Sequence, residues 1–417
     1  MKLVSSINEI NYGSYDEGLD WNIQNYRVYS NGKNLTGKKA QLRLNSCLRF
    51  NIFTENLQAE LEFLRSSEAL RIMLVSYDTE HDSYLEKTWL LNVKHFSWEG
   101  SPEKYEIRGK GLGLDFAVSC DGLGALLVHF SHFDQYHIHF ISHIHRADRK
   151  PLRNVNPFDF DTWSFSEKHA MLDCGSISLV LEGNNYTTSA RPEPGAAPNF
   201  NLSYEWYGGY FPPSTRELRC QFWQQGTADQ GAFAEEARGL EMRGLETQGL
   251  ETRGLETRGR AASNPSALIS DEELEVSSLR EQMAPQYRPG RLPELAGSLL
   301  LMGHDSCSSE SAIWVEQKVR YRLPRIVPSF GRSEPAISKN GRLLPDLEWN
   351  ISAGKHLSLN FRPFNINGAP QLVFPLTQMQ RIYGLFHGKL LDQFGDAIPI
   401  QKALGFIDYR RIQWRKR

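Results

Sequence analysis

The stretch from Gln41 to Phe53, QLRLNSCLRFNIF, alternates between two kinds of side chain along its whole length. The even positions carry Leu42, Leu44, Ser46, Leu48, Phe50 and Ile52, and the odd positions carry Gln41, Arg43, Asn45, Cys47, Arg49 and Asn51. Successive side chains of an extended strand point to opposite faces of its sheet. The alternation therefore predicts a β-strand with one buried, apolar face.

The same period of two recurs in both halves of the chain. In the first half it is visible at Leu70/Ile72/Leu74, Leu112/Leu114/Phe116/Val118, Leu126/Val128/Phe130 and Ile177/Leu179/Leu181. In the second half, alternating runs over 347–351 and 357–361 flank a loop that contains Gly354, which predicts a hairpin. Residues 383–417 are expected to form several short strands, punctuated by Gly384, Gly388, Gly395 and Gly405.

Helical spacing of apolar residues is scarce in both halves, whereas short strands and turn residues are frequent. This pattern favours antiparallel barrels or sandwiches over a fold in which strands and helices alternate. A chain of 417 residues is long enough for two or three domains. We therefore expect an all-β, antiparallel fold of two barrel or sandwich units, an N-terminal β domain over residues 1–224 and a C-terminal one over residues 298–417.

A low-complexity insert, residues 225–297, separates the two expected domains. Within it, residues 238–259 read RGLEM-RGLET-QGLET-RGLET-RG. A glycine at every fifth position disfavours a helix, and one leucine per unit is too little apolar surface to bury. The sequence Ser270-Asp271-Glu272-Glu273 begins like a capping box and predicts a short helix that runs to about Met283.

Composition excludes several classes of function. The chain has 47 basic and 49 acidic side chains, a net charge of -2, which gives no reason to expect nucleic acid or an anionic membrane as the main partner. No apolar stretch approaches the ~18 residues that span a bilayer, and residues 1–13 do not resemble a signal peptide. The five cysteines are scattered and odd in number, which argues against a disulfide framework and indicates a cytoplasmic location.

A run of histidines is the most unusual local feature. In YHIHFISHIH, His137, His139, His143 and His145 occupy odd positions, and Ile138, Phe140 and Ile144 occupy even ones. On a strand this places four imidazoles on one face, where they are candidate ligands of a divalent metal ion. The alternative is that the apolar residues face a core and the histidines line a polar surface. His137 and His145 would lie ~26 Å apart, so all four cannot bind one ion.

Three acidic residues lie in apolar or aromatic surroundings: Glu205 in YEW, Glu310 in SESAIW and Asp408 in GFIDY. A carboxyl group in such a place can have a raised pKa and act as a general acid. We take Glu310 and Asp408 as the candidate catalytic acids. The alternative for each is a carboxylate that accepts hydrogen bonds from its neighbours.

Aromatic residues are numerous, with 22 phenylalanines, 16 tyrosines and nine tryptophans. An antiparallel barrel with aromatic walls can hold an apolar ligand. The candidate ligand contacts are Trp206, Trp314, Phe386 and His387. No organic cofactor is expected.

An ordered series of short motifs runs through the centre and the C-terminal part of the chain. It comprises residues 166–186 (SEKHAMLDCGSISLVLEGNNY), GGYFPP from Gly208, Trp223, Gly303, Glu310–Trp314, the run to Leu323, Trp349, Leu357–Pro363, Tyr383–Gly388, Gly395, Ile398, Ile400, Gly405–Asp408 and Trp414. Taken together, the series resembles the bacterial domain-of-unknown-function family 2804. Ser311 departs from the family pattern, which usually has Asn there, and Glu316-Gln317 replaces a glycine-containing turn.

The resemblance implies a fold rather than an activity, because this family has no established reaction and no catalytic residues to carry over. It is distantly similar to the lipocalin-like barrel proteins that include carotenoid hydratases and tocopherol cyclases. Such proteins act on long apolar substrates without an organic cofactor. Three hypotheses remain open: a module that binds a hydrophobic small molecule, a hydratase, cyclase or isomerase that uses a buried acid, and a metal-binding protein built on the histidine strand.

Deletion of residues 238–259 is expected to leave the thermal unfolding midpoint unchanged, because long insertions in surface loops cost little stability. Differential scanning calorimetry of the full-length and deleted proteins measures this. A substantial shift of the midpoint would mean that the repeat belongs to the folded structure.

Overall fold

A computed structural model of the protein describes residues 2–5, 9–15, 20–30, 33–35, 44–66, 69–144, 151–158, 162–189, 199–212, 214–226, 292–303, 307–315, 319–323, 327–330, 349–367, 376–392 and 395–414. Over these residues the chain forms antiparallel strands almost throughout, which confirms the predicted all-β fold. A single turn of 3-10 helix, η1 (Ile23–Asn25), is found in this described part. The pentapeptide repeat and the helix expected after Ser270 lie outside the described residues.

Three large sheets account for most of the strands. The middle sheet has the order β1 (Gly13–Tyr15), β13 (Leu152–Pro157), β14 (Trp163–His169), β18 (Phe200–Tyr210), β4 (Asn45–Thr54), β5 (Leu57–Arg65), β6 (Ala69–Asp78), β7 (Ser83–Asn92). The outer sheet has the order β16 (Asn184–Asn185), β15 (Asp173–Leu181), β12 (Tyr136–His143), β11 (Ala125–His132), β10 (Leu114–Asp121), β9 (Lys104–Gly111), β8 (Phe96–Ser101), and β17 (Thr188–Ser189) also pairs with β15.

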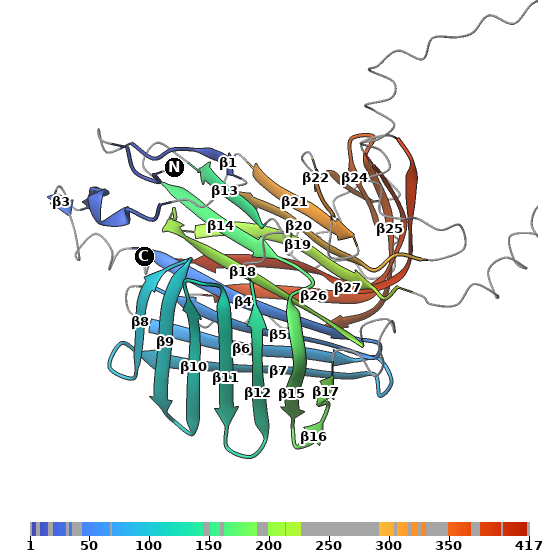
Figure 1. The fold of residues 1–417 in the computed structure, drawn as a ribbon, viewed down its shortest axis with the longest axis horizontal. Coiled ribbons are helices and arrows are strands. Elements are labelled where there is room, and N and C mark those ends of the chain that lie inside the picture. Colours follow the sequence, from blue (N-terminus) through green and yellow to red (C-terminus); the bar gives the residue numbers. More distant parts are fainter. Residues whose placement is uncertain are drawn as a thin grey trace, which may run out of the picture.

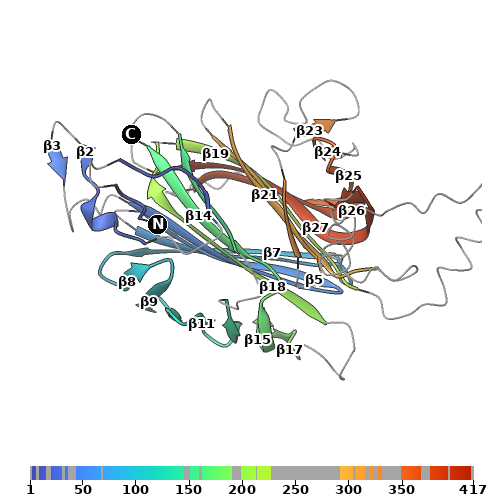
Figure 2. The same ribbon diagram turned by 45° about the horizontal axis from the view of Figure 1, so that its top comes forward.

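The C-terminal sheet has the order β22 (Val319–Leu323), β21 (Cys307–Val315), β20 (Leu295–Gly303), β19 (Ser214–Gln224), β27 (Ala397–Gln413), β26 (Leu376–Leu391), β25 (Leu357–Asn367), β24 (Trp349–Ala353), β23 (Val327–Phe330). A small hairpin of β2 (Val28–Ser30) and β3 (Lys33–Leu35) completes the described strands. The three sheets form three layers, with the middle sheet between the other two (Figures 1 and 2).

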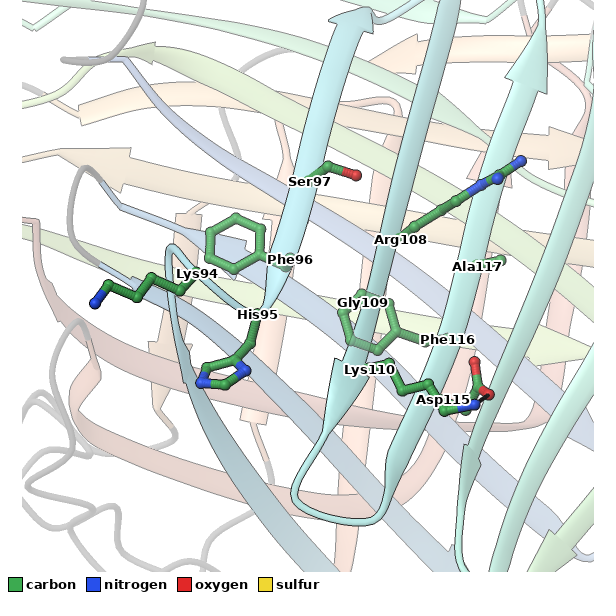
Figure 3. A pocket seen from close by; sticks show the side chains of 10 residues that line it. All are labelled: Lys94, His95, Phe96, Ser97, Arg108, Gly109, Lys110, Asp115, Phe116 and Ala117. Atoms are coloured by element: carbon green, nitrogen blue, oxygen red, sulfur yellow. Dashed lines mark ion pairs between the residues drawn. The ribbon is translucent and has the colours of Figure 1, made fainter.

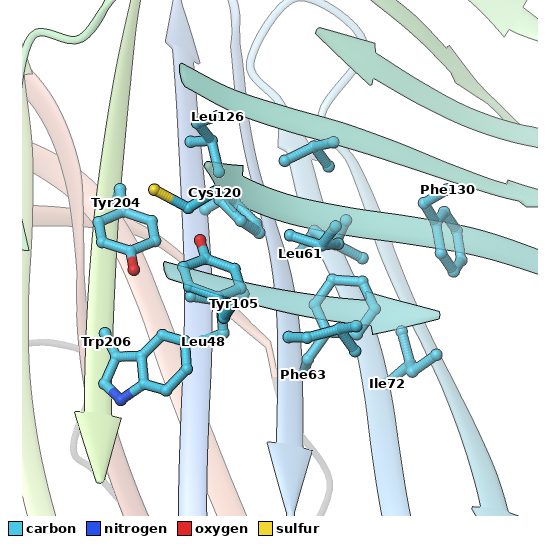
Figure 4. Packing of buried hydrophobic residues seen from close by; sticks show 14 of the residues in the cluster. Leu48, Leu61, Phe63, Ile72, Tyr105, Cys120, Leu126, Phe130, Tyr204 and Trp206 are labelled. Atoms are coloured by element: carbon cyan, nitrogen blue, oxygen red, sulfur yellow. The ribbon is translucent and has the colours of Figure 1, made fainter. Parts of the chain in front are cut away.

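The first core lies between the middle and outer sheets. The alternation of apolar and polar residues over 41–53 explains how β4 contributes to it. Leu48, Phe50 and Ile52 of β4 point into this core together with alternate residues of β5, β6 and the outer strands. Figure 4 shows their packing against side chains such as Tyr105 and Phe130. Each fully buried side chain of this size stabilises the fold by roughly 1.5–3 kcal/mol relative to exposure, so the two sheets form one sandwich.

The C-terminal sheet is curved and has a core of its own on its concave side (Figure 1). It begins earlier than the sequence indicated, because β19 pairs with β20 and β27. The domain boundary predicted after residue 224 therefore assigns β19 to the N-terminal domain, although this strand belongs to the C-terminal sheet. The hairpin predicted around Gly354 is confirmed as β24 and β25.

The expectation of several short strands after residue 383 is wrong, since β26 and β27 are 16 and 17 residues long. Gly384 and Gly405 lie opposite each other inside these strands. A Cβ atom on Gly384 would come within 2.7 Å of the Phe361 ring, and one on Gly405 within 2.7 Å of the Phe222 side chain. These glycines make room for aromatic packing and do not mark turns.

The second interface, between the middle and C-terminal sheets, is ionic at its centre. Strand β4 is buried on both faces, so its polar face, predicted to be the unburied one, is covered by the C-terminal sheet. The fully buried charged side chains here are Arg49, Glu60, Glu62, Arg71 and Glu205 of the middle sheet and Glu217, Arg219, Arg381, Asp408 and Arg410 of the C-terminal sheet. We call these ten residues the ionic layer; its formal charges balance.

Several pairs of the ionic layer join the two sheets. Arg49 binds Glu217 with two hydrogen bonds, Nη1 to Oε1 at 2.5 Å and Nη2 to Oε2 at 3.0 Å. Glu60 accepts hydrogen bonds at Oε1 from Arg410 Nη2 at 2.6 Å and from Arg381 Nη2 at 3.0 Å. Buried ions are tolerated only when they are paired in this way.

Aromatic stacking between the same two sheets flanks the ionic layer at two places. The rings of Tyr77 on β6 and Tyr383 on β26 stack with centroids 4.6 Å apart. Phe211, which follows β18, stacks on Trp414, which follows β27, at 4.3 Å. These contacts belong to two further clusters of buried residues, so the ionic layer is enclosed by apolar side chains.

The substitution Arg49→Met is expected to lower the free energy of unfolding by about 3–5 kcal/mol, because it leaves Glu217 buried without its bidentate partner. Denaturant titration followed by tryptophan fluorescence measures the change. The double variant Arg49→Met/Glu217→Leu is expected to recover part of the loss. A single variant as stable as the wild type would contradict a structural role of the pair.

Candidate functional site

The three acids singled out in the sequence lie together between the middle and C-terminal sheets. Glu205 comes from β18, Glu310 from β21 and Asp408 from β27. Arg219 connects two of them, with its Nη1 3.6 Å from Glu205 and its Nη2 3.7 Å from Asp408. Glu205 is also close enough to Glu310 for its charge to influence the proton affinity of that carboxyl. This interface is therefore the candidate site.

Glu310 lies at the border of the ionic layer and is held by side chains from the middle sheet. Asn156 Nδ2 donates a hydrogen bond to its Oε1, and Ser166 Oγ donates one to its Oε2. Lys168 Nζ donates to the Glu310 backbone carbonyl at 3.1 Å and lies 3.9 Å from Oε2. The Glu310 side chain is buried, whereas Asn156, which donates to it, is only half-buried.

Burial raises the pKa of the Glu310 carboxyl above its ordinary value, and Lys168, Ser166 and Asn156 oppose this shift without cancelling it. The nearby carboxylate of Glu205 adds to the increase. Desolvation disfavours the charged form of an acid, and one lysine at 3.9 Å compensates less than several arginines in direct contact. Burial therefore shifts Glu310 toward its protonated form, which is the direction that the sequence-based hypothesis requires.

Asp408 does not fit the role of general acid that its sequence context indicated. Burial acts to raise the pKa of Asp408, but Arg410, Arg381 and Arg219 outweigh it and hold the pKa well below its usual range. Its Oδ2 accepts hydrogen bonds from Arg410 Nε at 2.6 Å and from Arg381 Nη2 at 2.8 Å. Asp408 is thus a carboxylate without a proton to donate, and its part is structural.

Glu205 also behaves as a structural carboxylate. Its Oε1 accepts hydrogen bonds from Gln221 Nε2 at 2.5 Å and from Ser298 Oγ at 2.7 Å, both on the C-terminal sheet. Its Oε2 faces Arg49 and Arg219 at 3.8 and 3.6 Å. Of the three acids, Glu310 alone forms its hydrogen bonds and its ion pair without an arginine, within the part of the chain that the structure describes.

The four predicted ligand contacts do not share one site. Trp206 packs in the first core, 4.7 Å from the Tyr105 ring, and Phe386 packs in the core of the C-terminal sheet. His387 is partly buried at the turn side of β26, where its Nδ1 accepts a hydrogen bond from Lys402 N at 3.3 Å. Trp314 lies four residues after Glu310 on β21 and packs in another cluster of buried residues.

The histidine strand is confirmed as β12, with Ile138, Phe140 and Ile144 buried and His137, His139 and His143 on the outer face. His129 of β11 joins the first two, with ring centroids 5.5 and 6.0 Å from them. Exposed Ile141 separates His143 from this group, and His145 lies outside the described residues. Among the described residues, no three His, Cys, Asp or Glu side chains come together as possible ligands of one metal ion.

A surface hollow of about 480 Å³ lies elsewhere, at one corner of the outer sheet (Figure 3). Its lining includes Lys94, His95, Arg108, Lys110 and Asp115. Lys110 Nζ is 3.1 Å from Asp115 Oδ2, and both side chains are exposed, so the pair contributes little stability. This hollow is remote in sequence from Glu310.

Sequence reasoning missed the arginines of the ionic layer and the residues that contact Glu310, which are Asn156, Ser166 and Lys168. Arg49, Glu60 and Glu62 stand at polar positions of alternating strands, where a solvent-exposed face is the usual expectation. The sequence did carry one sign of a buried ionic interface: basic and acidic residues stand at the polar positions of successive strands, such as Arg49 and Glu62. Ser166 and Lys168 give no signal at all, because their meaning depends on a strand more than 140 residues later in the chain.

Comparison with known proteins leaves the family open. No family model and no curated protein match the chain. Nine chains among the solved structures match it. One is the crystal structure of kievitone hydratase from Nectria haematococca, with 9% identity and a TM-score of 0.42 over 88% of this chain and 89% of that chain. A likeness of this degree carries no argument about activity, and the resemblance to family 2804 stays a prediction. No helix among the described residues is long and apolar enough to cross a membrane.

Glu310→Gln and Asp408→Asn are expected to change the pH dependence of stability in opposite directions. A raised folded-state pKa favours folding below the unfolded value of about 4.3, and this contribution is lost as the pH rises. Glu310→Gln should therefore gain stability relative to the wild type between pH 4 and pH 8, to an extent on the order of 1 kcal/mol.

A depressed pKa, as at Asp408, gives stability that is present above about pH 4 and lost in acid. Asp408→Asn should therefore be destabilised most at neutral pH, and its deficit should shrink as the pH falls. Thermal unfolding of both variants across this pH range measures the two trends. Parallel pH curves for Glu310→Gln and wild type would contradict the raised pKa.

Proposed function

We propose that the protein is a cofactor-independent enzyme of the hydratase or isomerase type that transfers a proton to an apolar small molecule. The observation that carries the proposal is Glu310, a buried carboxyl group whose pKa is raised and whose orientation is fixed by Asn156 and Ser166. A general acid needs a proton at neutral pH and a fixed direction for donating it. At Glu310 the raised pKa acts toward the first condition, and the hydrogen bonds from Asn156 and Ser166 supply the second.

The neighbouring side chains supply the rest of the proposed machinery. Trp314 lies on the same face of β21 as Glu310, and Tyr207 lies beneath Lys168 Nζ, which is 5.6 Å from its ring centre. Aromatic faces stabilise a cation that develops on an apolar substrate. Lys168 lies 3.9 Å from Oε2 and stabilises the carboxylate that remains after proton donation.

The proposed step balances without a cofactor. The Glu310 carboxyl group donates its proton to one carbon of a carbon–carbon double bond, and the positive charge moves to the other carbon. In a hydration, water adds to that carbon and its released proton returns to the Glu310 carboxylate. In an isomerisation, a neighbouring C–H bond loses its proton to the same carboxylate.

A module that only binds a hydrophobic molecule remains the second candidate. The buried aromatic side chains favour it, including the offset contacts of Trp206 with Trp98 and Tyr105 in the first core. Binding without proton transfer would need no group with the properties of Glu310, and for that reason we place the enzyme first.

The test uses a total apolar extract of the host cells, incubated with the purified full-length protein in D2O. An active enzyme is expected to add D2O to, or exchange deuterium into, at least one component, as detected by mass spectrometry. Glu310→Gln is expected to reduce the rate by at least about 100-fold, the usual contribution of a general acid. Binding of the same component by Glu310→Gln, measured by native mass spectrometry, should persist.

Lys389→Gln is a matched control, because this exposed residue lies on the C-terminal sheet away from the site and should leave the rate unchanged. Deuterium incorporation by Glu310→Gln at the wild-type rate would exclude Glu310 as the acid. Co-purification of an apolar component that never acquires deuterium with the wild type would instead establish the binding module.

A further inference from the structure

Three turns at one end of the outer sheet each expose a large apolar side chain. Val93 lies between β7 and β8, Leu112 between β9 and β10, and Phe133 between β11 and β12, with exposed fractions of 55%, 71% and 67%. The strand register aligns Phe96 with Gly109 and Leu114 with His132, which places these turns along the same edge. We call Val93, Leu112 and Phe133 the apolar tips; the turns that join β9 to β10 and β11 to β12 lie along the lower edge of the outer sheet in Figure 1.

Two of the apolar tips adopt a backbone conformation that their side chains disfavour. Leu112 has φ of 55° and Phe133 has φ of 49°, in the left-handed region that glycine, asparagine and aspartate tolerate best. A leucine and a phenylalanine at such positions cost stability and are also exposed to water. No contact within the described part of the chain accounts for an exposed, apolar side chain at either position. Strained backbone of this kind clusters at binding sites.

The turns that carry Leu112 and Phe133 are in direct contact with each other. Phe133 N donates a hydrogen bond to Gly113 O at 3.3 Å, and the Phe133 ring covers Gly113 so closely that a Cβ atom there would lie 2.3 Å from it. Gly113 is the direct neighbour of Leu112, so glycine at this position lets the aromatic ring lie beside the adjacent turn.

The hollow beside the apolar tips is lined by basic side chains. Lys94 and His95 follow Val93 directly, and Lys110 comes two residues before Leu112 (Figure 3). Arg108 is the fourth, and it pairs with exposed Glu106, as Lys110 pairs with Asp115 at 3.1 Å. Such exposed pairs are weak and exchange readily for another anion. The net charge of the whole chain, -2, does not reveal that these basic side chains gather at the hollow.

We propose that this edge is a docking surface for an anionic lipid membrane, in which the apolar tips enter the acyl boundary and the basic hollow receives phosphate headgroups. Apolar residues on projecting turns next to basic ones match the two attractions that hold peripheral proteins on a bilayer. A protein partner would be matched better by a flat, continuous patch than by separate tips beside a basic hollow. The occupant is therefore the lipid surface.

The test measures sedimentation of the full-length protein with vesicles of phosphatidylcholine containing one quarter phosphatidylglycerol, and with vesicles of pure phosphatidylcholine. The wild type is expected to bind the anionic vesicles more tightly. Leu112→Asn/Phe133→Asn is expected to reduce the partition coefficient for both by more than about ten-fold, since each buried methylene strengthens partitioning roughly four-fold. Because asparagine tolerates the left-handed conformation, the thermal midpoint should not fall.

Lys94→Gln/Lys110→Gln is expected to weaken binding to the anionic vesicles by about five-fold per charge and to leave binding to pure phosphatidylcholine unchanged. Leu123→Asn is the matched control, since Leu123 is 86% exposed in the turn between β10 and β11, at the opposite end of the same sheet. This variant should bind vesicles as the wild type does.

Three outcomes would overturn the proposal. The first is a wild type that sediments with neither kind of vesicle. The second is a Leu112→Asn/Phe133→Asn variant that binds as the wild type does. The third is a dimer, detected by analytical ultracentrifugation, that the same variant abolishes.

Discussion

Ten charged side chains buried between two sheets constrain the whole structure. Each ionised group taken out of water must find partners within hydrogen-bond distance, because an unpaired buried charge costs several kcal/mol. Arg49 has Glu62 as a partner in its own sheet and completes its hydrogen bonds with Glu217 of β19. Arg410 has Asp408 in its own strand and completes its hydrogen bonds with Glu60 of β5. The ionic layer therefore fixes how the C-terminal sheet lies on the N-terminal sandwich, whereas apolar packing alone would accept neighbouring registers.

The same layer gives its carboxyl groups opposite properties. At the centre, Arg410, Arg381 and Arg219 outweigh the desolvation of Asp408 and keep it ionised. At the border, Glu310 has one lysine and two neutral hydrogen-bond donors, and desolvation prevails. A protein interior that stabilises many carboxylates can in this way raise the pKa of one carboxyl group, provided that the group lies where the arginines do not reach.

The candidate site could be predicted only in part. The apolar and aromatic surroundings of Glu310 in the sequence indicated a buried acid correctly, and the same reasoning misjudged Asp408. The difference lies in the partners: those of Asp408 come from β19, β26 and its own strand, and those of Glu310 from β13 and β14. Such long-range pairings leave no local pattern. The dispersal of Trp206, Trp314 and Phe386 into three clusters has the same cause.

The sequence by itself determined that the chain is an antiparallel β protein, because the period of two from Gln41 to Phe53 and its repeats admit no other regular structure. It also determined which face of the histidine strand is buried. Only the tertiary structure decided that the polar face of β4 is covered as well, since alternation separates two faces without saying what lies against either one. Arg49 is a surface residue by its local pattern and becomes an interior one because Glu217, far along the chain, neutralises it.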